Sequence, residues 1–300
     1  MIEIKGIDNE KCIKCLKCVK ACPVDLFYKP ETEIGEKRQI IFEDPVGSCI
    51  MCGHCVSICP TDAVIFESDE PFEVFEGVED PSKITSLENY LHLIRSRRSI
   101  RQYKDKSVDK EDIEAILNVM KYAPTASNAQ ERRFVVVKDT DLISRIRKAT
   151  ENMLKLLKKL LKWGKYLKFL LPKRFKVMIE DPTREDSLER QLKAIKEGKD
   201  HVFHGAPVVI IMYAPVVGSE LMAGNDAGLA FSHGMEAALT KGLGSCWIGF
   251  AQEALNRSDD LKEDLNIDDD MTVIGVMILG HPAVEYKKAP PREPLKVDWI

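Results

Sequence analysis

The sequence predicts an α+β protein of two domains, and three observations support this. The chain has 300 residues, more than one ordinary domain of about 100 to 200 residues requires. Eight of its nine cysteines fall within the first 60 residues, which sets a small N-terminal domain apart. Beyond residue 84, short runs rich in valine and isoleucine alternate with helical periodicity, which indicates a sheet buried between helices.

The N-terminal cysteines stand in two copies of one spacing, C-x2-C-x2-C-x3-C-P. Two-residue gaps let three thiolates converge on one cubane, and the fourth thiolate, followed by proline, points to the other cluster. The spacing therefore predicts two [4Fe-4S] clusters with crossed ligation, and it resembles the bacterial two-cluster ferredoxin. The predicted ligands are Cys12, Cys15, Cys18 and Cys59 for one cluster, and Cys49, Cys52, Cys55 and Cys22 for the other.

Structural zinc and disulfides are the alternatives for paired cysteines. Zinc takes four ligands per ion and usually has a longer gap between ligand pairs, so three closely spaced thiolates suit it poorly. No charged and apolar leader marks the chain for secretion, so we expect a soluble, cytoplasmic protein with reduced cysteines. His54 lies between two of the cysteines, but the cysteines already complete both ligand sets.

Charge and composition divide the chain further. Residues 1–66 form the predicted cluster domain, with a hairpin-like insertion at 28–42 between its halves, and residues 67–83 form an acidic linker. Up to residue 80 there are 8 Lys and Arg against 17 Asp and Glu, whereas the remaining chain has 36 against 31. Such an acidic domain repels nucleic acid and attracts basic docking surfaces.

The second domain, residues 84–300, begins with two predicted helices. The first starts at Leu87 with Ser86 as its N-cap, and the next follows Asp109 and ends before Pro124. Another helix is predicted over 227–241, with Asp226 as its cap. Four buried strands are predicted at 134–138, 208–214, 246–250 and 272–279. The longest apolar run, at about 206–217, is too short to span a membrane.

A basic element, RRSIRQY, follows the first of these helices at residues 97–103. Guanidinium groups and a hydroxyl offer donors that suit a phosphate dianion, although a basic helix end favoured by the helix dipole gives the same pattern. Three more motifs follow: APTASNAQ at 123–130, GLGSCWIG at 242–249, and LGHP with PPREPL from residue 279 onwards. Together, the four motifs resemble those of the nitroreductase family of FMN enzymes.

That resemblance implies a central mixed sheet flanked by helices, with FMN at a homodimer interface. The basic element would grip the phosphate, and the small-residue loop would approach the flavin of the partner subunit. Gly249 has no side chain, so backbone amides can come close to the flavin there. The implied FMN-binding residues are Arg97, Arg98, Ser99, Arg101, Pro124, Thr125, Ala126, Asn128, Ile248, Gly249 and Arg292.

Other residues near these motifs receive different interpretations. Glu and Arg at 131–132 stand where the family usually has Pro and Trp. Cys246 is expected to be a buried, inert thiol. His201, His204 and His233 are interpreted as structural or surface groups, because nothing pairs them with a carboxylate or a third ligand. No side chain is predicted to be catalytic, since the flavin itself carries the chemistry.

A lysine-rich amphipathic helix is predicted at 151–176, within a variable helical insertion of about 151–200. Its lysines occupy about half of the helical circumference, and leucines with Trp163 occupy most of the rest. The helix could cover the active site or the dimer seam, lie on a membrane surface, or receive an acidic ferredoxin-like partner. We favour the covering role, because related enzymes have variable helices over the flavin.

The whole sequence predicts an iron–sulfur flavoprotein oxidoreductase. Iron–sulfur clusters exchange single electrons and a flavin holds one or two, so electrons can pass from a low-potential donor to a small organic acceptor. The resemblance implies a nitro or quinone-like acceptor, and a ferredoxin is the expected donor. The alternatives are reduction by NAD(P)H, an adaptor that relays electrons to a partner redox complex, and a membrane-peripheral quinone reductase.

Overall fold

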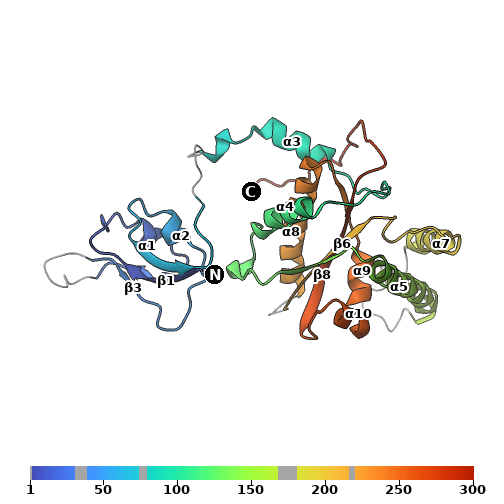
Figure 1. The fold of residues 1–300 in the computed structure, drawn as a ribbon, viewed down its shortest axis with the longest axis horizontal. Helices are drawn as coiled ribbons and strands as arrows, with labels where there is room; N and C mark the ends of the chain where they lie inside the picture. Colours follow the sequence, from blue (N-terminus) through green and yellow to red (C-terminus); the bar gives the residue numbers. More distant parts are fainter. Residues whose placement is uncertain (1, 31–38, 74–79, 168–180, 216–219) are drawn as a thin grey trace. The chain divides into compact units, whose positions relative to one another are not determined.

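The computed structural model describes residues 2–30, 39–73, 80–167, 181–215 and 220–300 (Figure 1). The chain divides into two compact units. The first comprises Met1–Thr85 with Thr125–Gln130, and the second comprises Ser86–Pro124 with Glu131–Ile300. The tip of the predicted insertion, part of the acidic linker and the end of the lysine-rich helix lie outside the described residues. Within those residues, no helix is long and apolar enough to cross a membrane.

The first unit consists of two small antiparallel sheets and two short helices. Strand β1 (Ile2–Ile7) pairs with β4 (Val64–Ser68), and β2 (Phe27–Tyr28) pairs with β3 (Ile41–Phe42). The β2–β3 pairing confirms the ends of the predicted hairpin. Helices α1 (Lys17–Ala21) and α2 (His54–Ser57) each begin one residue after a left-handed N-cap.

The two halves of this unit repeat one backbone path. Residues with a left-handed backbone conformation recur at equivalent positions around the cysteines. Few non-glycine residues adopt this conformation without a structural reason. The equivalent pairs are Lys14 and Met51, Leu16 and Gly53, and Asp25 and Asp62, with φ between 49° and 71°. The internal repeat that the cysteine spacing predicts is thereby confirmed in the backbone.

The second unit is built on a four-stranded sheet of order β5-β6-β8-β7. Its strands are β5 (Arg133–Val137), β6 (Val208–Pro215), β7 (Gly244–Trp247) and β8 (Met271–Gly280), and all neighbours pair antiparallel. An isolated parallel bridge joins Ser99 to Ser245 at the edge strand β7. Both faces are covered, because alternate residues of β6 enter two separate hydrophobic clusters.

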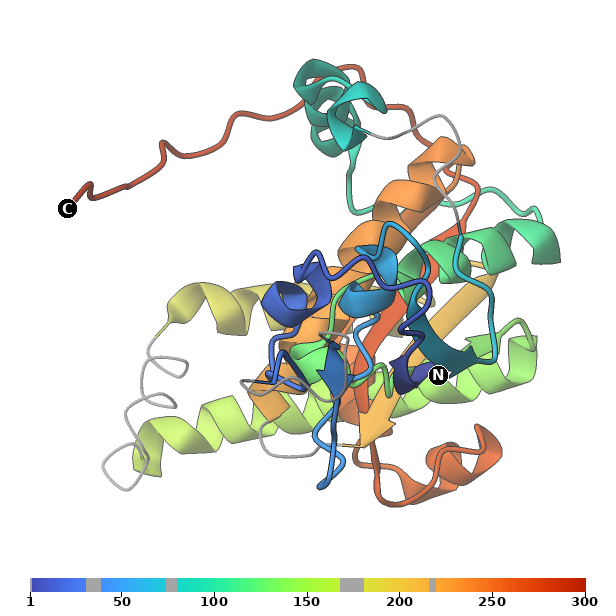
Figure 2. The same ribbon diagram turned by 90° about the vertical axis from the view of Figure 1, so that its left-hand side faces the viewer.

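Helices pack on each face of the sheet (Figure 1). On one face lie α4 (Lys110–Lys121) and α8 (Glu220–Thr240). The other face carries α5 (Thr140–Leu167), α9 (Gly249–Leu255) and α10 (Asp259–Asp264). Helix α7 (Pro182–Lys196) packs against α5 through a cluster of four buried leucines, and Figure 2 shows α5 as one long helix. The remaining helical elements are α3 (Leu87–Ser96), η1 (Pro81–Lys83) and η2 (Ala126–Asn128).

Most of the predicted elements are present, with corrections at three boundaries. The lysine-rich helix expected from residue 151 already begins at Thr140 as α5. The Ser86 side chain accepts a hydrogen bond from Asn89 N at 3.1 Å, which confirms the predicted cap of α3. The predicted cap of α8 at Asp226 is wrong, since that helix already begins at Glu220. The strand expected at 246–250 ends at Trp247, and α9 begins at Gly249, where buried Ala251 packs into the core from a helix rather than from a strand.

Gly275 on β8 leaves no room for a side chain. A Cβ there would overlap Cε2 of Phe231, which is fully buried on α8. Because the core cannot relax freely, we expect Gly275→Ala to destabilise the protein by about 1–3 kcal/mol.

The matched control for this change is Gly224→Ala on α8, where a Cβ would meet nothing within 4 Å. This substitution should be neutral or stabilising by up to about 1 kcal/mol. Thermal unfolding of the two variants measures the difference. Equal midpoints would show that Phe231 does not fill the space beside Gly275.

Candidate functional site

The eight N-terminal cysteines surround two small cavities of about 20 Å³ each within the first unit. We call them the first and second cysteine cavities. The first is lined by Cys12, Cys15, Cys18 and Cys59, and the second by Cys49, Cys52, Cys55 and Cys22. Each cavity thus joins three cysteines of one half with the proline-followed cysteine of the other, as the crossed pattern requires.

Backbone N–H groups donate to the fourth sulfur in both halves. Leu26 N donates to Cys22 Sγ at 3.4 Å, and Ala63 N donates to Cys59 Sγ at 3.2 Å. Hydrogen bonds to cluster sulfurs help to set reduction potentials. The two bonds occupy equivalent positions, so the repeat extends from the backbone path to the surroundings of the sulfurs.

The cysteine cavities fit a thiolate-bound cluster. All nine cysteines of the chain are free of disulfides, and their positions all belong to the described residues. Burial raises the pKa of the Cys55 thiol to about 11, and coordination to a metal centre would favour the thiolate there. Among the described residues, no group of three His, Cys, Asp or Glu side chains converges closely enough for a single metal ion.

A much larger cavity of about 1110 Å³ lies within the second unit. We call it the α5 cavity, because one apolar side of α5 forms much of its wall. The rest of the wall comes from the loop before β6, from Arg101, from Gln191 of α7, and from the segment that runs from β7 through α9 to Arg257. Of the residues implied to bind FMN, Arg101, Ile248 and Gly249 line this cavity.

The segment that carries Arg101 is fixed along the edge of the sheet. Ile100 N donates to the Ser245 carbonyl at 3.0 Å, and Lys104 N donates to the His281 carbonyl at 2.8 Å. Gly244 permits this approach, because a Cβ there would lie 2.5 Å from Cγ1 of Ile100. The glycine of the third motif therefore positions the arginine of the first.

The other members of the basic element lie outside the lining of the α5 cavity. Arg97 ends α3, Ser99 bridges to β7, and the Arg98 guanidinium lies 5.2 Å from the ring centre of Tyr286. Arg292 is exposed and makes no hydrogen bond or ion pair with any described residue. A single chain thus brings one of the four predicted basic residues to the cavity wall.

The small-residue loop at 124–130 behaves differently from the other motifs. Its residues Thr125–Gln130 group with the first unit, leaving Pro124 in the second. Asn128 Nδ2 donates to the carbonyls of Ile50 and Met51, each at 3.0 Å, and these residues lie between Cys49 and Cys52. Among residues 124–130, three non-glycine residues take left-handed conformations. The predicted flavin loop therefore contacts a cysteine loop, and its members Thr125, Ala126 and Asn128 do not line the α5 cavity.

In the pair at 131–132 that departs from the family pattern, Arg132 donates hydrogen bonds at the C-terminal end of α4. Arg132 Nη2 donates to the carbonyl of Ala123 at 2.7 Å, and Glu131 is exposed. Orphan carbonyls at a helix C-terminus need such donors. The arginine thus has a structural role next to the small-residue loop.

Two histidines interpreted as structural or surface groups instead line the α5 cavity. His201 and His204 lie on the loop before β6, with ring centres 6.0 Å apart. Burial lowers the pKa of His204, Arg101 and His201 lower it further, and Asp200 opposes them. His204 is therefore largely neutral at neutral pH and has one ring N–H to donate.

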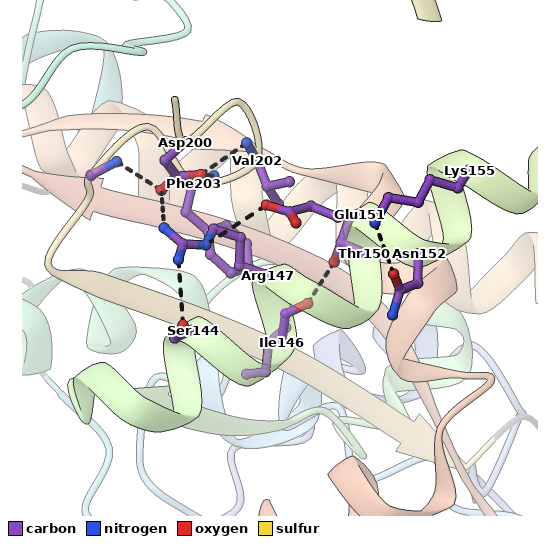
Figure 3. Close-up of polar contacts among 11 residues, drawn as sticks. Ser144, Ile146, Arg147, Thr150, Glu151, Asn152, Lys155, Asp200, Val202 and Phe203 are labelled. Carbon is purple, nitrogen blue, oxygen red and sulfur yellow. Dashed lines mark hydrogen bonds and ion pairs between the residues drawn. The ribbon is translucent and has the colours of Figure 1, made fainter. Parts of the chain in front are cut away.

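Asp200 fixes the loop that carries these histidines (Figure 3). Its carboxylate accepts backbone hydrogen bonds from Val202 N at 3.0 Å, Phe203 N at 2.8 Å and Gly205 N at 3.0 Å. Arg147 on α5 lies 3.9 Å from both Asp200 and Glu151. The loop is consequently tied to α5, the helix that supplies the apolar wall.

The apolar residues of α5 account for the rest of the cavity. Its lining includes Met153, Leu156, Leu157, Leu160 and Trp163. Lysines of the same helix point elsewhere: Lys158 forms an ion pair with Glu189 on α7 at 2.7 Å, and Lys155 and Lys159 are exposed. This division agrees with a helix that covers a site and keeps its lysines in water. The end of this lysine-rich segment, from Lys168 onwards, lies outside the described residues.

Two family models match the chain. Residues 94–281 match the nitroreductase family, and residues 4–60 match the 4Fe-4S dicluster domain. A protein of Archaeoglobus fulgidus, provisionally named an NADH dehydrogenase/NAD(P)H nitroreductase, is 28% identical over 199 residues, which cover 66% of this chain and 88% of that protein.

Solved structures share the fold of the second unit. A nitroreductase with bound FMN from Desulfitobacterium hafniense is 22% identical, covers 72% of this chain and 100% of its own, and gives a TM-score of 0.53. A nitroreductase with bound FMN from Bacteroides fragilis is 20% identical, covers 70% and 98%, and gives a TM-score of 0.50.

Proposed function

The chain belongs to the nitroreductase family and carries a 4Fe-4S dicluster domain, and from this premise we propose that it is an iron–sulfur flavoprotein oxidoreductase. Electrons pass from a low-potential donor through two [4Fe-4S] clusters to FMN, and from FMN to an organic acceptor. The α5 cavity is the main observation behind this proposal. An adaptor would need room for FMN alone, whereas this cavity of about 1110 Å³ exceeds the range of about 300–1,000 Å³ for a pocket with a single ligand.

The clusters are assigned to the two cysteine cavities. Three features support this: four cysteines line each cavity, the thiols are free, and a backbone N–H reaches the fourth sulfur in each half. The crossed ligand sets follow from the same lining. Cubanes bound by thiolates exchange single electrons, which makes this domain the entry for a one-electron donor.

FMN is assigned to the side of the α5 cavity formed by Arg101, Ile248 and Gly249. When bound, FMN accepts one or two electrons and can deliver a hydride. Arg101 is free to bind an anionic or polar group of the cofactor, because it forms no ion pair with any described residue. The backbone at Gly249 leaves space for the ring. Arg97, Arg98, Ser99, Pro124, Thr125, Ala126, Asn128 and Arg292 complete the proposed FMN-binding set.

We propose that the protein is a homodimer. Helix α3 turns its apolar residues Leu87, Tyr90 and Leu91 to the surface, with no buried residue on the helix. The C-terminal residues Trp299 and Ile300 are also fully or almost fully exposed. Exposed apolar patches of this kind mark association surfaces. A partner subunit would cover them and would supply the FMN-binding groups that a single chain leaves outside the cavity.

NAD(P)H is the second candidate for the electron donor. The Archaeoglobus fulgidus relative is named for NADH and NAD(P)H, which favours direct reduction of the flavin. The acidic charge of residues 1–80 and the dicluster domain favour a protein donor of low potential instead. We retain the protein donor because a nicotinamide that reduces flavin directly would leave two clusters without a task.

Cofactor analysis of the anaerobically purified protein tests this assignment. We expect about eight irons, about eight sulfides and one FMN per chain, because each cluster contributes four of each atom. The visible spectrum should show flavin bands over a broad cluster absorption. Zinc in place of iron, or protein without flavin after purification and FMN addition, would contradict the proposal.

A further inference from the structure

The α5 cavity is larger than one flat ring requires. Pockets for single drug-sized ligands measure about 300–1,000 Å³, whereas this cavity measures about 1110 Å³. Its polar lining residues include Arg101, His201 and His204, and apolar residues of α5 form much of the rest of its wall. Room therefore remains beside the proposed flavin for a second, elongated molecule.

The wall formed by α5 is apolar yet uncovered. Leu156 is 46% exposed, Leu160 56% and Trp163 67%, although all three line the cavity. Two more charged side chains line it, Glu253 on α9 and Arg257 just after that helix, and they neutralise one another, since Arg257 Nε donates to Glu253 Oε1 at 2.8 Å. Apolar surface left open inside a cavity favours an occupant with an apolar chain.

The polar end is suited to an uncharged oxygen. His204 is largely neutral and half-buried, and the loop that carries it is fixed by three hydrogen bonds to Asp200. A neutral imidazole N–H in the same cavity lining as the Arg101 cation can donate to a carbonyl oxygen and stabilise negative charge that develops there.

Resting on the proposed function, we propose that the acceptor is amphipathic: a conjugated ring with a carbonyl oxygen, carrying a long alkyl chain. The oxygen accepts a hydrogen bond from His204, and the chain lies along Leu156, Leu160 and Trp163. For a quinone of this kind, reduction takes two electrons and two protons. When bound, reduced FMN would supply both electrons and one proton as a hydride, and water would supply the other proton and remain as hydroxide, so the product would be the hydroquinone.

The test uses two benzoquinones that differ only in one side chain, methyl in the first probe and decyl in the second. Binding to the oxidised protein is measured by quenching of tryptophan fluorescence, and reduction is measured separately as kcat/KM. Each fully buried methylene strengthens binding by up to about fourfold. For a chain that stays partly exposed, we expect the decyl probe to bind at least about 30-fold more tightly.

Three variants separate the two ends of the site. Leu160→Ser should reduce the decyl-to-methyl affinity ratio several-fold, whereas Lys159→Ser, an exposed position on the same helix outside the cavity lining, should leave the ratio unchanged. His204→Gln should weaken both probes by a similar factor and so preserve the ratio. An affinity ratio near one in the wild-type protein, or equal effects of the two α5 variants, would overturn the inference. If both probes bind but neither is reduced, the proposed function fails instead.

Discussion

Loss of one cluster is the expected result when Cys22 is replaced with serine, and that cluster is the one assigned to Cys49, Cys52 and Cys55. Cys22 lines the cavity of those three cysteines although it follows the first set in sequence. A missing thiolate leaves the cubane with three ligands. Iron should therefore fall from about eight to about four atoms per chain, as measured by colorimetric iron analysis.

Double variants distinguish crossed from uncrossed ligation. Cys22→Ser with Cys49→Ser removes two ligands of one predicted set, so about four irons should remain. Cys22→Ser with Cys12→Ser removes one ligand from each set, so little iron should remain. Uncrossed ligation predicts the reverse order. Cys246→Ser is the matched control, because this buried ninth cysteine lies in the second unit and should keep all the iron.

Loss of FMN with retention of iron is the expected result for Arg97→Ala combined with Arg101→Ala. Hydrogen bonds to charged groups contribute about 1.5–3 kcal/mol each, so the double change should weaken FMN binding by about 100-fold or more. Flavin fluorescence after gel filtration measures what remains bound, and iron analysis reports on the clusters.

The control for this pair is Arg95→Ala. Arg95 lies in the last turn of α3, is exposed, and belongs to the same basic segment outside the motif. It should retain FMN. Comparable loss from Arg95→Ala and from the double variant would mean that a general positive charge, rather than the motif, binds the cofactor.

The sequence allowed most of the fold to be predicted because its signals are local. The run at 208–214 is apolar on both faces, as a central strand must be, and β6 is buried over this length. Ser86 and the helical period behind it predict α3 correctly. The boundary between β7 and α9 was missed since an apolar run of four or five residues suits a strand and a buried helix equally well.

The candidate site could be predicted only where the spacing of residues along the chain determines which groups bind together. Cysteine spacing leads directly to two sets of four thiols. His201 and His204 carry no such signal, because their importance depends on the fold that brings the loop before β6 beside Arg101 and α5. A sequence hint exists in Asp200, whose side chain can cap a following turn, but the direction of the histidines depends on tertiary packing.

The exposed apolar face of α3 shows a second limit of prediction from the sequence. Its periodicity correctly predicts an amphipathic helix, yet its apolar residues Leu87, Tyr90 and Leu91 remain exposed in the single chain. Periodicity identifies an apolar face without saying which surface covers it. For this reason the proposed dimer rests on the family resemblance together with the exposed apolar area of α3.

In the proposed function, electrons reach the flavin through the clusters. Anaerobic rapid mixing with a reduced ferredoxin tests it most directly, with wild type compared to the Cys12→Ser/Cys22→Ser variant that should lack both clusters but keep FMN. We predict that ferredoxin reduces the wild-type flavin after the cluster absorption bleaches, and leaves the variant's flavin oxidised. Rapid flavin reduction by NADPH in both proteins, with none by ferredoxin in either, would contradict the account.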